Sequence, residues 1–140
     1  MIKKILIIED NPNDIKYYQS LFSPEKEVSF LFFSRDKDYT KEKLIELISI
    51  SYETIAKKIK DCFVLVEKDI VDFLKDKLFD FYLADSLGGI ADLFVDRAGL
   101  PKDKVAFLSS TTSFRESVWD KGYRAYKKEN IDELIRDCLN

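Results

Sequence analysis

The sequence predicts an α/β fold built on a doubly wound parallel sheet, and three observations carry that prediction. Apolar runs of strand length alternate with helix-like segments along the chain. The first run, Ile5 to Ile8, is continuously apolar, as expected of a parallel strand that helices cover on both faces. With 140 residues, of which 46% are hydrophobic, the chain is expected to form one domain, residues 1–140.

The N-terminal part of the chain is expected to contribute two strands. The first strand ends at two adjacent acids, Glu9 and Asp10, and Pro12 then suits the start of a helix over residues 14–22. Residues 28–33, VSFLFF, are apolar and aromatic enough for a second buried strand.

The middle of the chain leaves the number of strands open. A helical stripe of apolar residues predicts a long amphipathic helix over residues 40–59, and its apolar face is expected to pack on the core. Residues 62–66, CFVLV, predict a strand, and residues 70–78 a short helix. Either the sheet has six strands, or one of VSFLFF and CFVLV belongs to an insertion beside a five-stranded core.

The C-terminal half continues the alternation. Residues 79–85 predict a buried strand that ends at Asp85, followed by a helix over 90–98 that Gly99 closes. A strand over 105–108 leads into the hydroxyl cluster 109–112 and a weak helix over 114–121. A short strand then ends in Lys127 and Lys128, and residues 131–139 form the closing helix.

Composition excludes several classes of function. The net charge is −3 with acids and bases interspersed, so nothing indicates nucleic-acid binding, and no segment is apolar enough to enter a membrane. The N-terminus leaves no room for a signal peptide, which predicts a cytoplasmic protein. The chain has no histidine, which removes Ser-His-Asp and Cys-His catalysis, and Cys62 and Cys138 are expected to be buried thiols.

Acidic residues end two of the predicted strands. In an open α/β sheet, ligands bind outside the carboxyl ends of the strands, so Glu9, Asp10 and Asp85 are expected to meet there, with Asp85 facing solvent. Three carboxylates at one edge suit Mg²⁺, a hard ion that prefers oxygen ligands. Taken separately, either acidic strand end is adequately explained as a solvated loop.

The order of the strand-end residues resembles the response-regulator receiver family of two-component signalling. ILIIEDNPND is similar to the family's opening strand with its paired acids, and DFYLAD to the strand that carries the phosphoacceptor aspartate. VAFLSS and YKKENIDEL look like the later passages that carry a hydroxyl residue and a lysine. The resemblance covers most of the chain outside residues 35–60. It implies a flavodoxin-like fold with five core strands and an insertion or extra strand between residues 35 and 78.

The resemblance also implies a role for each site residue. Asp85 would accept a phosphoryl group from a histidine kinase or phosphotransfer protein, and the chain would signal through a downstream protein rather than act as an enzyme. Mg²⁺ would be held by Glu9, Asp10, Asp85 and the backbone carbonyl of Leu87. Ser109, or alternatively Ser110, would donate a hydrogen bond to the phosphoryl group. Lys127 would pair with its charge, with Lys128 as the alternative.

Some positions depart from the family pattern and define competing hypotheses. Arg124 stands where the family usually places an aromatic switch, and no proline follows the lysines. These departures are typical of a pseudo-receiver that acts only as an interaction module. An aspartate-nucleophile phosphatase is a third alternative, but Leu87 occupies the position of its second aspartate. The hydroxyl cluster can also be explained by turn capping, and Trp119 and Tyr126 by core packing.

Overall fold

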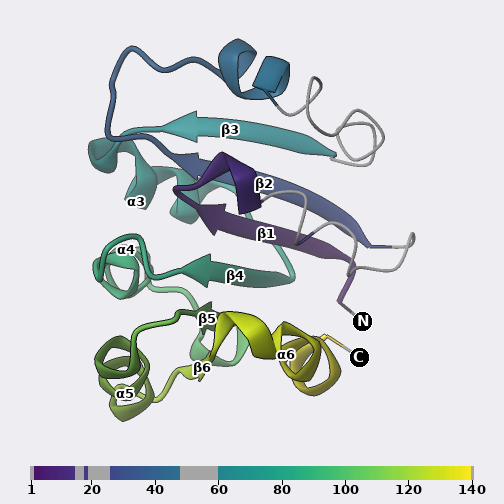
Figure 1. The fold of residues 1–140 in the computed structure, drawn as a ribbon, viewed down its shortest axis with the longest axis vertical. Coiled ribbons are helices and arrows are strands. Elements are labelled where there is room, and N and C mark those ends of the chain that lie inside the picture. Colours follow the sequence, from purple (N-terminus) through teal and green to yellow (C-terminus); the bar gives the residue numbers. More distant parts are fainter. Residues whose placement is uncertain (1, 15–17, 19–25, 48–59, 140) are drawn as a thin grey trace.

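Six parallel strands form one sheet in the order β3-β2-β1-β4-β5-β6. The structure is a computed structural model that describes residues 2–14, 18, 26–47 and 60–139. Figure 1 shows the arrows of the sheet pointing toward one edge, so the carboxyl ends of the strands share that edge. The strands are β1 (Lys4–Glu9), β2 (Glu27–Phe33), β3 (Asp61–Leu65), β4 (Phe81–Asp85), β5 (Val105–Leu108) and β6 (Arg124–Tyr126).

Helices connect the strands, as the alternating pattern predicted. The α-helices with defined bounds are α3 (Glu67–Asp76), α4 (Ala91–Ala98), α5 (Thr112–Asp120) and α6 (Ile131–Cys138), and residues 41–47 are also helical. Three short 3-10 helices are η1 (Pro12–Asp14), η2 (Lys102–Lys104) and η3 (Lys128–Asn130). Most of the helix expected over residues 14–22, and residues 48–59 of the long helix, lie outside the described residues. The helix over 90–98 is confirmed as α4, which ends at Gly99 in the left-handed conformation.

The two faces of the sheet build two separate apolar clusters, because successive side chains of a strand point to opposite faces. On β1, Ile5 and Ile7 belong to one cluster, whereas Leu6 and Ile8 belong to the other. The first cluster also takes side chains of α6, and the second takes those of α3, α4 and α5. Both faces are therefore covered by helices, which explains why the interiors of the central strands are apolar apart from Ser29 on β2.

The number of strands, which the sequence left open, is six within the described residues. Residues 61–65 do not form an insertion beside the sheet; they pair with β2 from Ser29 opposite Asp61 to Phe33 opposite Leu65. β3 therefore extends the sheet beyond β2 as its edge strand. Most residues of β3 are less buried than those of the central strands, as expected at a sheet edge.

Several expectations about single residues are now decided. Cys62 and Cys138 are free and buried, as predicted. Tyr126 packs against the core, but the prediction for Trp119 was wrong, because 62% of its surface is exposed on α5. The helical residues near Trp119 that face the core are Phe114 and Val118, which already fill that side of α5. None of the described helices is long and apolar enough to cross a membrane.

Candidate functional site

The pairing of β1 with β4 brings two acids to one level of the sheet. Ile8 lies opposite Ala84, so the next residues along the two parallel strands are Glu9 and Asp85. Glu9 follows Ile5 and Ile7 in alternation, and Asp85 follows Phe81 and Leu83, so both acids extend the rows of one face. This convergence of two strand ends was predicted, and it follows directly from a parallel register.

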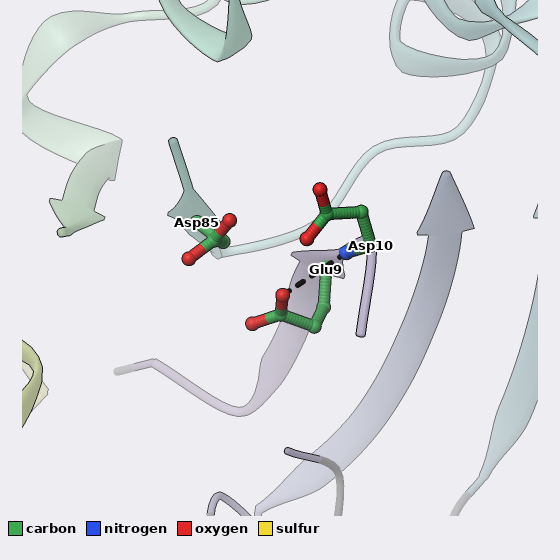
Figure 2. Close-up of side chains that lie close together, drawn as sticks. All are labelled: Glu9, Asp10 and Asp85. Carbon is green, nitrogen blue, oxygen red and sulfur yellow. Dashed lines mark hydrogen bonds between the residues drawn. The ribbon is translucent and has the colours of Figure 1, made fainter. Parts of the chain in front are cut away.

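Asp10 completes a cluster of three carboxyl groups. Ligand oxygens of Glu9, Asp10 and Asp85 all lie within 4.8 Å of one another. Figure 2 shows the three side chains gathered where β1 and β4 end, with Glu9 bonded to the backbone nitrogen of Asp10. Oxygen atoms at this spacing can bind one small divalent cation.

Glu9 is the most enclosed acid of the cluster, with 1% of its surface exposed. Its Oε1 accepts hydrogen bonds from the backbone N–H groups of Asp10 and Asn11, and its Oε2 accepts one from the Tyr18 hydroxyl at 2.8 Å. Burial, followed by the nearby charge of Asp85, raises the pKa of Glu9 to about 8. The cluster therefore contains a carboxyl group whose charge is unfavourable unless a cation compensates it.

Asp85 is paired with a lysine, and the lysine is Lys128. Its Nζ lies 2.8 Å from Asp85 Oδ1 and 3.4 Å from Asp14 Oδ2. The sequence favoured Lys127 and kept Lys128 as the alternative; Lys127 is exposed and precedes η3, whose first residue Lys128 makes the contact with Asp85. Burial lowers the pKa of Lys128, but the bond to Asp85 and the surrounding acids raise it on balance.

Asp85 does not face solvent as the sequence suggested, since only 6% of its surface is exposed. Lys128 contacts one of its carboxylate oxygens, and the backbone N–H of Leu87 donates to the other at 3.0 Å. The carboxylate is therefore held in one orientation by bonds on both oxygens.

The β4–α4 loop adopts a backbone conformation that few residues take. Leu87 has a φ of +52° although it carries a side chain, and that side chain is fully buried. Gly88 follows at a φ of +72°, where a Cβ would lie 2.8 Å from Arg35 Nη2. Burial of the leucine and the absence of a side chain at Gly88 together hold the Leu87 carbonyl at the site.

Arg35 occupies the side of the cluster opposite Lys128. Its Nη2 donates to the Leu87 carbonyl at 3.3 Å and lies 3.8 Å from Asp10 Oδ2. The guanidinium also stacks over the Phe33 ring, 5.5 Å from its centroid. Arg35 thus contacts two of the groups that the sequence assigned to Mg²⁺.

Ser109 directly follows β5, the strand that pairs with β4, and is buried. Asp85 lies opposite Leu108 in the β4–β5 register, so Ser109 is one step beyond the acid. Its Oγ accepts the N–H of Thr111 at 3.1 Å, and its carbonyl accepts Arg115 Nη1 at 2.8 Å. The turn-capping explanation therefore holds for Ser109, and its hydroxyl has no acceptor among the residues that the structure describes. Ser110, the alternative, is exposed.

Sequence reasoning missed Arg35 and Asp14 as neighbours of the site. Arg35 stands two residues after β2, the strand that pairs with β1 on the side away from β4. The rule that located Glu9 and Asp85, polar residues at the carboxyl ends of strands, would also have found Arg35. Asp14 ends η1, and only the contact with Lys128 reveals its place.

The donor set fits a divalent cation. Glu9, Asp10 and Asp85 supply carboxylate oxygens within reach of one another, and burial together with the charge of Asp85 raises the pKa of Glu9. The Leu87 carbonyl and Asp10 both contact Arg35 Nη2. Mg²⁺ is commonly bound by one or two carboxylates with several waters, so this set is sufficient.

The fold and the site define a parallel α/β protein with a cluster of three carboxyl groups at the carboxyl edge of its sheet. Comparison with known proteins adds no narrower class: no model of a protein family matches this sequence, and no curated protein is similar to it.

Proposed function

We propose that this chain is a stand-alone receiver of two-component phosphorelay signalling, which accepts a phosphoryl group on Asp85 with Mg²⁺ and signals through protein contacts. The observation that carries the proposal is the contact set of Asp85. A buried carboxylate at a strand end has two acids within ligand distance and a lysine at 2.8 Å.

The sheet order supports a flavodoxin-like receiver fold. When the edge strand β3 is set aside, the remaining order β2-β1-β4-β5-β6 corresponds to 2-1-3-4-5, the order of flavodoxin-like sheets. The site lies where β1 and β4 meet, beside the point at which the chain reverses its direction of growth across the sheet. Ligands of such sheets bind at that point.

The proposed reaction is a transfer to a carboxylate nucleophile. An oxygen of Asp85 forms a bond to the phosphorus of the donor, while the bond from phosphorus to the leaving group breaks and that group keeps the electron pair. The product is an acyl phosphate on Asp85. Bound Mg²⁺ would offset the negative charge of the phosphoryl oxygens.

The chain's own residues have matching tasks. Leu87 N–H fixes one oxygen of Asp85, which leaves the other, now on Lys128, as the attacking atom. Lys128 would then transfer its contact to a phosphoryl oxygen, because an ammonium group on a flexible stem can follow the charge. Ser109 Oγ would donate a hydrogen bond to the same phosphoryl group. The movement of Ser109 toward that group would alter the start of α5.

Intact mass measurement after incubation with Mg²⁺ and acetyl phosphate tests the proposal. The expected result is one added phosphoryl group, which Asp85→Asn abolishes and chelation of Mg²⁺ prevents. The matched control is Asp80→Asn, since Asp80 is an acid at the opposite end of β4 that accepts the backbone N–H groups of Lys3 and Lys4. An adduct that survives Asp85→Asn would contradict the proposal.

A phosphorylation-independent interaction module is the second candidate, and one observation favours it. Lys128 and Arg35 already neutralise the acids, so the site is stable as a set of internal ion pairs. The residue three positions before Lys127 is Arg124, and the residue three positions before Lys128 is Ala125. Neither is aromatic. Absence of both an adduct and Mg²⁺ binding would favour this candidate. The phosphatase alternative lacks a second acid, because the buried Leu87 stands in its place.

A further inference from the structure

A second pocket adjoins the acidic cluster and has the opposite charge. It has a volume of about 200 Å³ and lies between the start of α5 and η3. Two hydroxyl residues, three basic residues and one acid line it: Ser110, Thr112, Arg115, Lys127, Lys128 and Glu129. A phosphate group with its first waters fits this volume, and hydroxyl, guanidinium and ammonium groups are its usual protein partners.

Two of the three basic residues carry charge that no acid neutralises among the described parts of the chain. Arg115 bonds to neutral acceptors, the Ser109 carbonyl at 2.8 Å and the Thr112 hydroxyl at 3.1 Å. Lys127 is exposed and makes no ion pair with any described residue. Lys128, by contrast, is paired with Asp85 and Asp14. Glu129 is the one acid of the lining, so the pocket keeps a net positive charge.

The arrangement of Arg115 makes the pocket a formed site rather than a group of flexible cations. Its guanidinium is half-buried and oriented by bonds at both terminal nitrogens. A guanidinium held in this way presents its remaining N–H donors in a fixed geometry, which suits the oxygens of phosphate. Lys127, which follows β6, adds a mobile charge from the facing wall.

We propose that this basic pocket binds a phosphate group. Its role rests on the proposed function: Lys128 lines the pocket and also contacts Asp85, so a phosphate held by Arg115 and Lys127 lies beside the residue that would receive it. The pocket therefore collects phosphate-bearing donors before transfer. In this proposal Lys127 binds the phosphoryl donor, whereas Lys128 contacts Asp85, the phosphoryl acceptor.

Titration with inorganic phosphate in the presence of a chelator tests the binding without any phosphotransfer chemistry. Calorimetry or protein NMR shifts measure the titration. Lys127→Gln is expected to weaken phosphate binding about five-fold, the value of one exposed ion pair. Glu129→Gln should strengthen binding by a similar factor, because it removes the acid of the pocket. Lys75→Gln is the matched control on α3, since Lys75 is exposed and does not line the pocket.

The signs of these changes decide the proposal. Weaker binding in Lys127→Gln, stronger binding in Glu129→Gln and unchanged binding in Lys75→Gln support it. No saturable binding, or equal affinities in the two lysine variants, overturns it. The Lys127 side chain is exposed and makes no ion pair with a described residue, and its only contact there is a backbone one, so loss of folding does not confuse the result.

Acetyl phosphate then separates a donor site from a site for free phosphate. If the pocket holds the donor, Lys127→Gln raises the half-saturating concentration for phosphorylation of Asp85 about five-fold and leaves the maximal rate unchanged. An unchanged half-saturation with weakened phosphate binding assigns the pocket to free phosphate and overturns the donor role. If no adduct forms at all, the proposed function fails while the phosphate titration still decides the pocket.

Discussion

Each flank of the acidic cluster has one basic side chain, but the two side chains differ in how closely they contact the acids. On one flank, Lys128 lies 2.8 Å from Asp85, and the neighbouring Glu9 is almost fully enclosed. On the other flank, Arg35 reaches Asp10 and the Leu87 carbonyl at 3.8 and 3.3 Å, and 64% of its side chain is exposed. The first flank is a buried, closely bonded set, and the second is a loose contact open to water.

This difference indicates which part of the site is preformed. Charges buried in close contact interact strongly, whereas exposed pairs contribute little and are screened by salt. The Lys128 flank should therefore determine stability and pH dependence. The Arg35 flank should yield to a cation that binds Asp10 and the Leu87 carbonyl more tightly.

The largest expected effect is a loss of stability with rising pH, due to Glu9. Its folded pKa is about 8, above the ordinary 4.5, so the folded chain holds a proton that the unfolded chain releases between these values. The free energy of unfolding should fall as pH rises from about 4.5 to about 8, by an amount on the order of a few kcal/mol. The chain has no histidine, so Glu9 dominates this window.

Urea unfolding at several pH values measures this effect, with Glu9→Gln as the variant. The glutamine keeps the size of the side chain and cannot ionise, so its stability should be nearly constant over the same range. Mg²⁺ should flatten the slope of the wild type, because a bound cation favours the ionised carboxyl. A wild-type slope equal to that of Glu9→Gln would show that Glu9 titrates normally.

The second prediction compares adjacent lysines. Lys128→Met leaves Asp85 buried beside Glu9 without its cation, and should lower the free energy of unfolding by about 1–2 kcal/mol. The loss should be smaller than for a fully buried pair, because 36% of the Lys128 side chain is exposed. Lys127→Met makes the same chemical change at an exposed position and should stay within about 0.5 kcal/mol of the wild type.

Chemical denaturation at pH 7 and low salt measures both variants. Equal losses, or a larger loss for Lys127→Met, would place the pairing lysine at the position that the sequence favoured. That outcome would remove the contrast between the flanks.

The smallest expected effect belongs to Arg35. Arg35→Ala removes a positive charge next to Asp10 and frees the Leu87 carbonyl, so Mg²⁺ should bind about two- to five-fold more tightly. Arg35→Lys retains the charge and should bind Mg²⁺ within about two-fold of the wild type. Calorimetric titration with Mg²⁺ distinguishes the two. Weaker Mg²⁺ binding in Arg35→Ala would mean that the arginine supports the cation instead of competing with it.

Local sequence patterns predicted much of the sheet and of the acidic cluster. Continuous apolar runs predicted the buried strands, and acids at the ends of two runs predicted the meeting of Glu9 with Asp85. Each of these predictions needs only the position of a residue within its own strand. Because a parallel register fixes which strand ends are level, the acids needed no further information to be placed together.

The features that the sequence did not determine depend on contacts between distant segments. Lys127 and Lys128 differ by one position, and only the direction of the chain into η3 decides which one turns toward Asp85. Burial of Asp85 arises from Lys128 and the β4–α4 loop together. Trp119 shows the same limit, because an aromatic residue is buried only where another part of the fold covers it, and the sequence does not reveal whether such a surface exists.

The most direct test of the account is to locate the phosphoryl group. After reaction with acetyl phosphate and Mg²⁺, borohydride reduces an aspartyl phosphate to homoserine, and peptide mass analysis then identifies the altered residue. We expect the mass change of aspartate to homoserine at Asp85 alone, with Glu9 and Asp10 unmodified. A modification at Glu9 or Asp10, or none anywhere in the presence of bound Mg²⁺, would contradict the assignment of Asp85 as the acceptor.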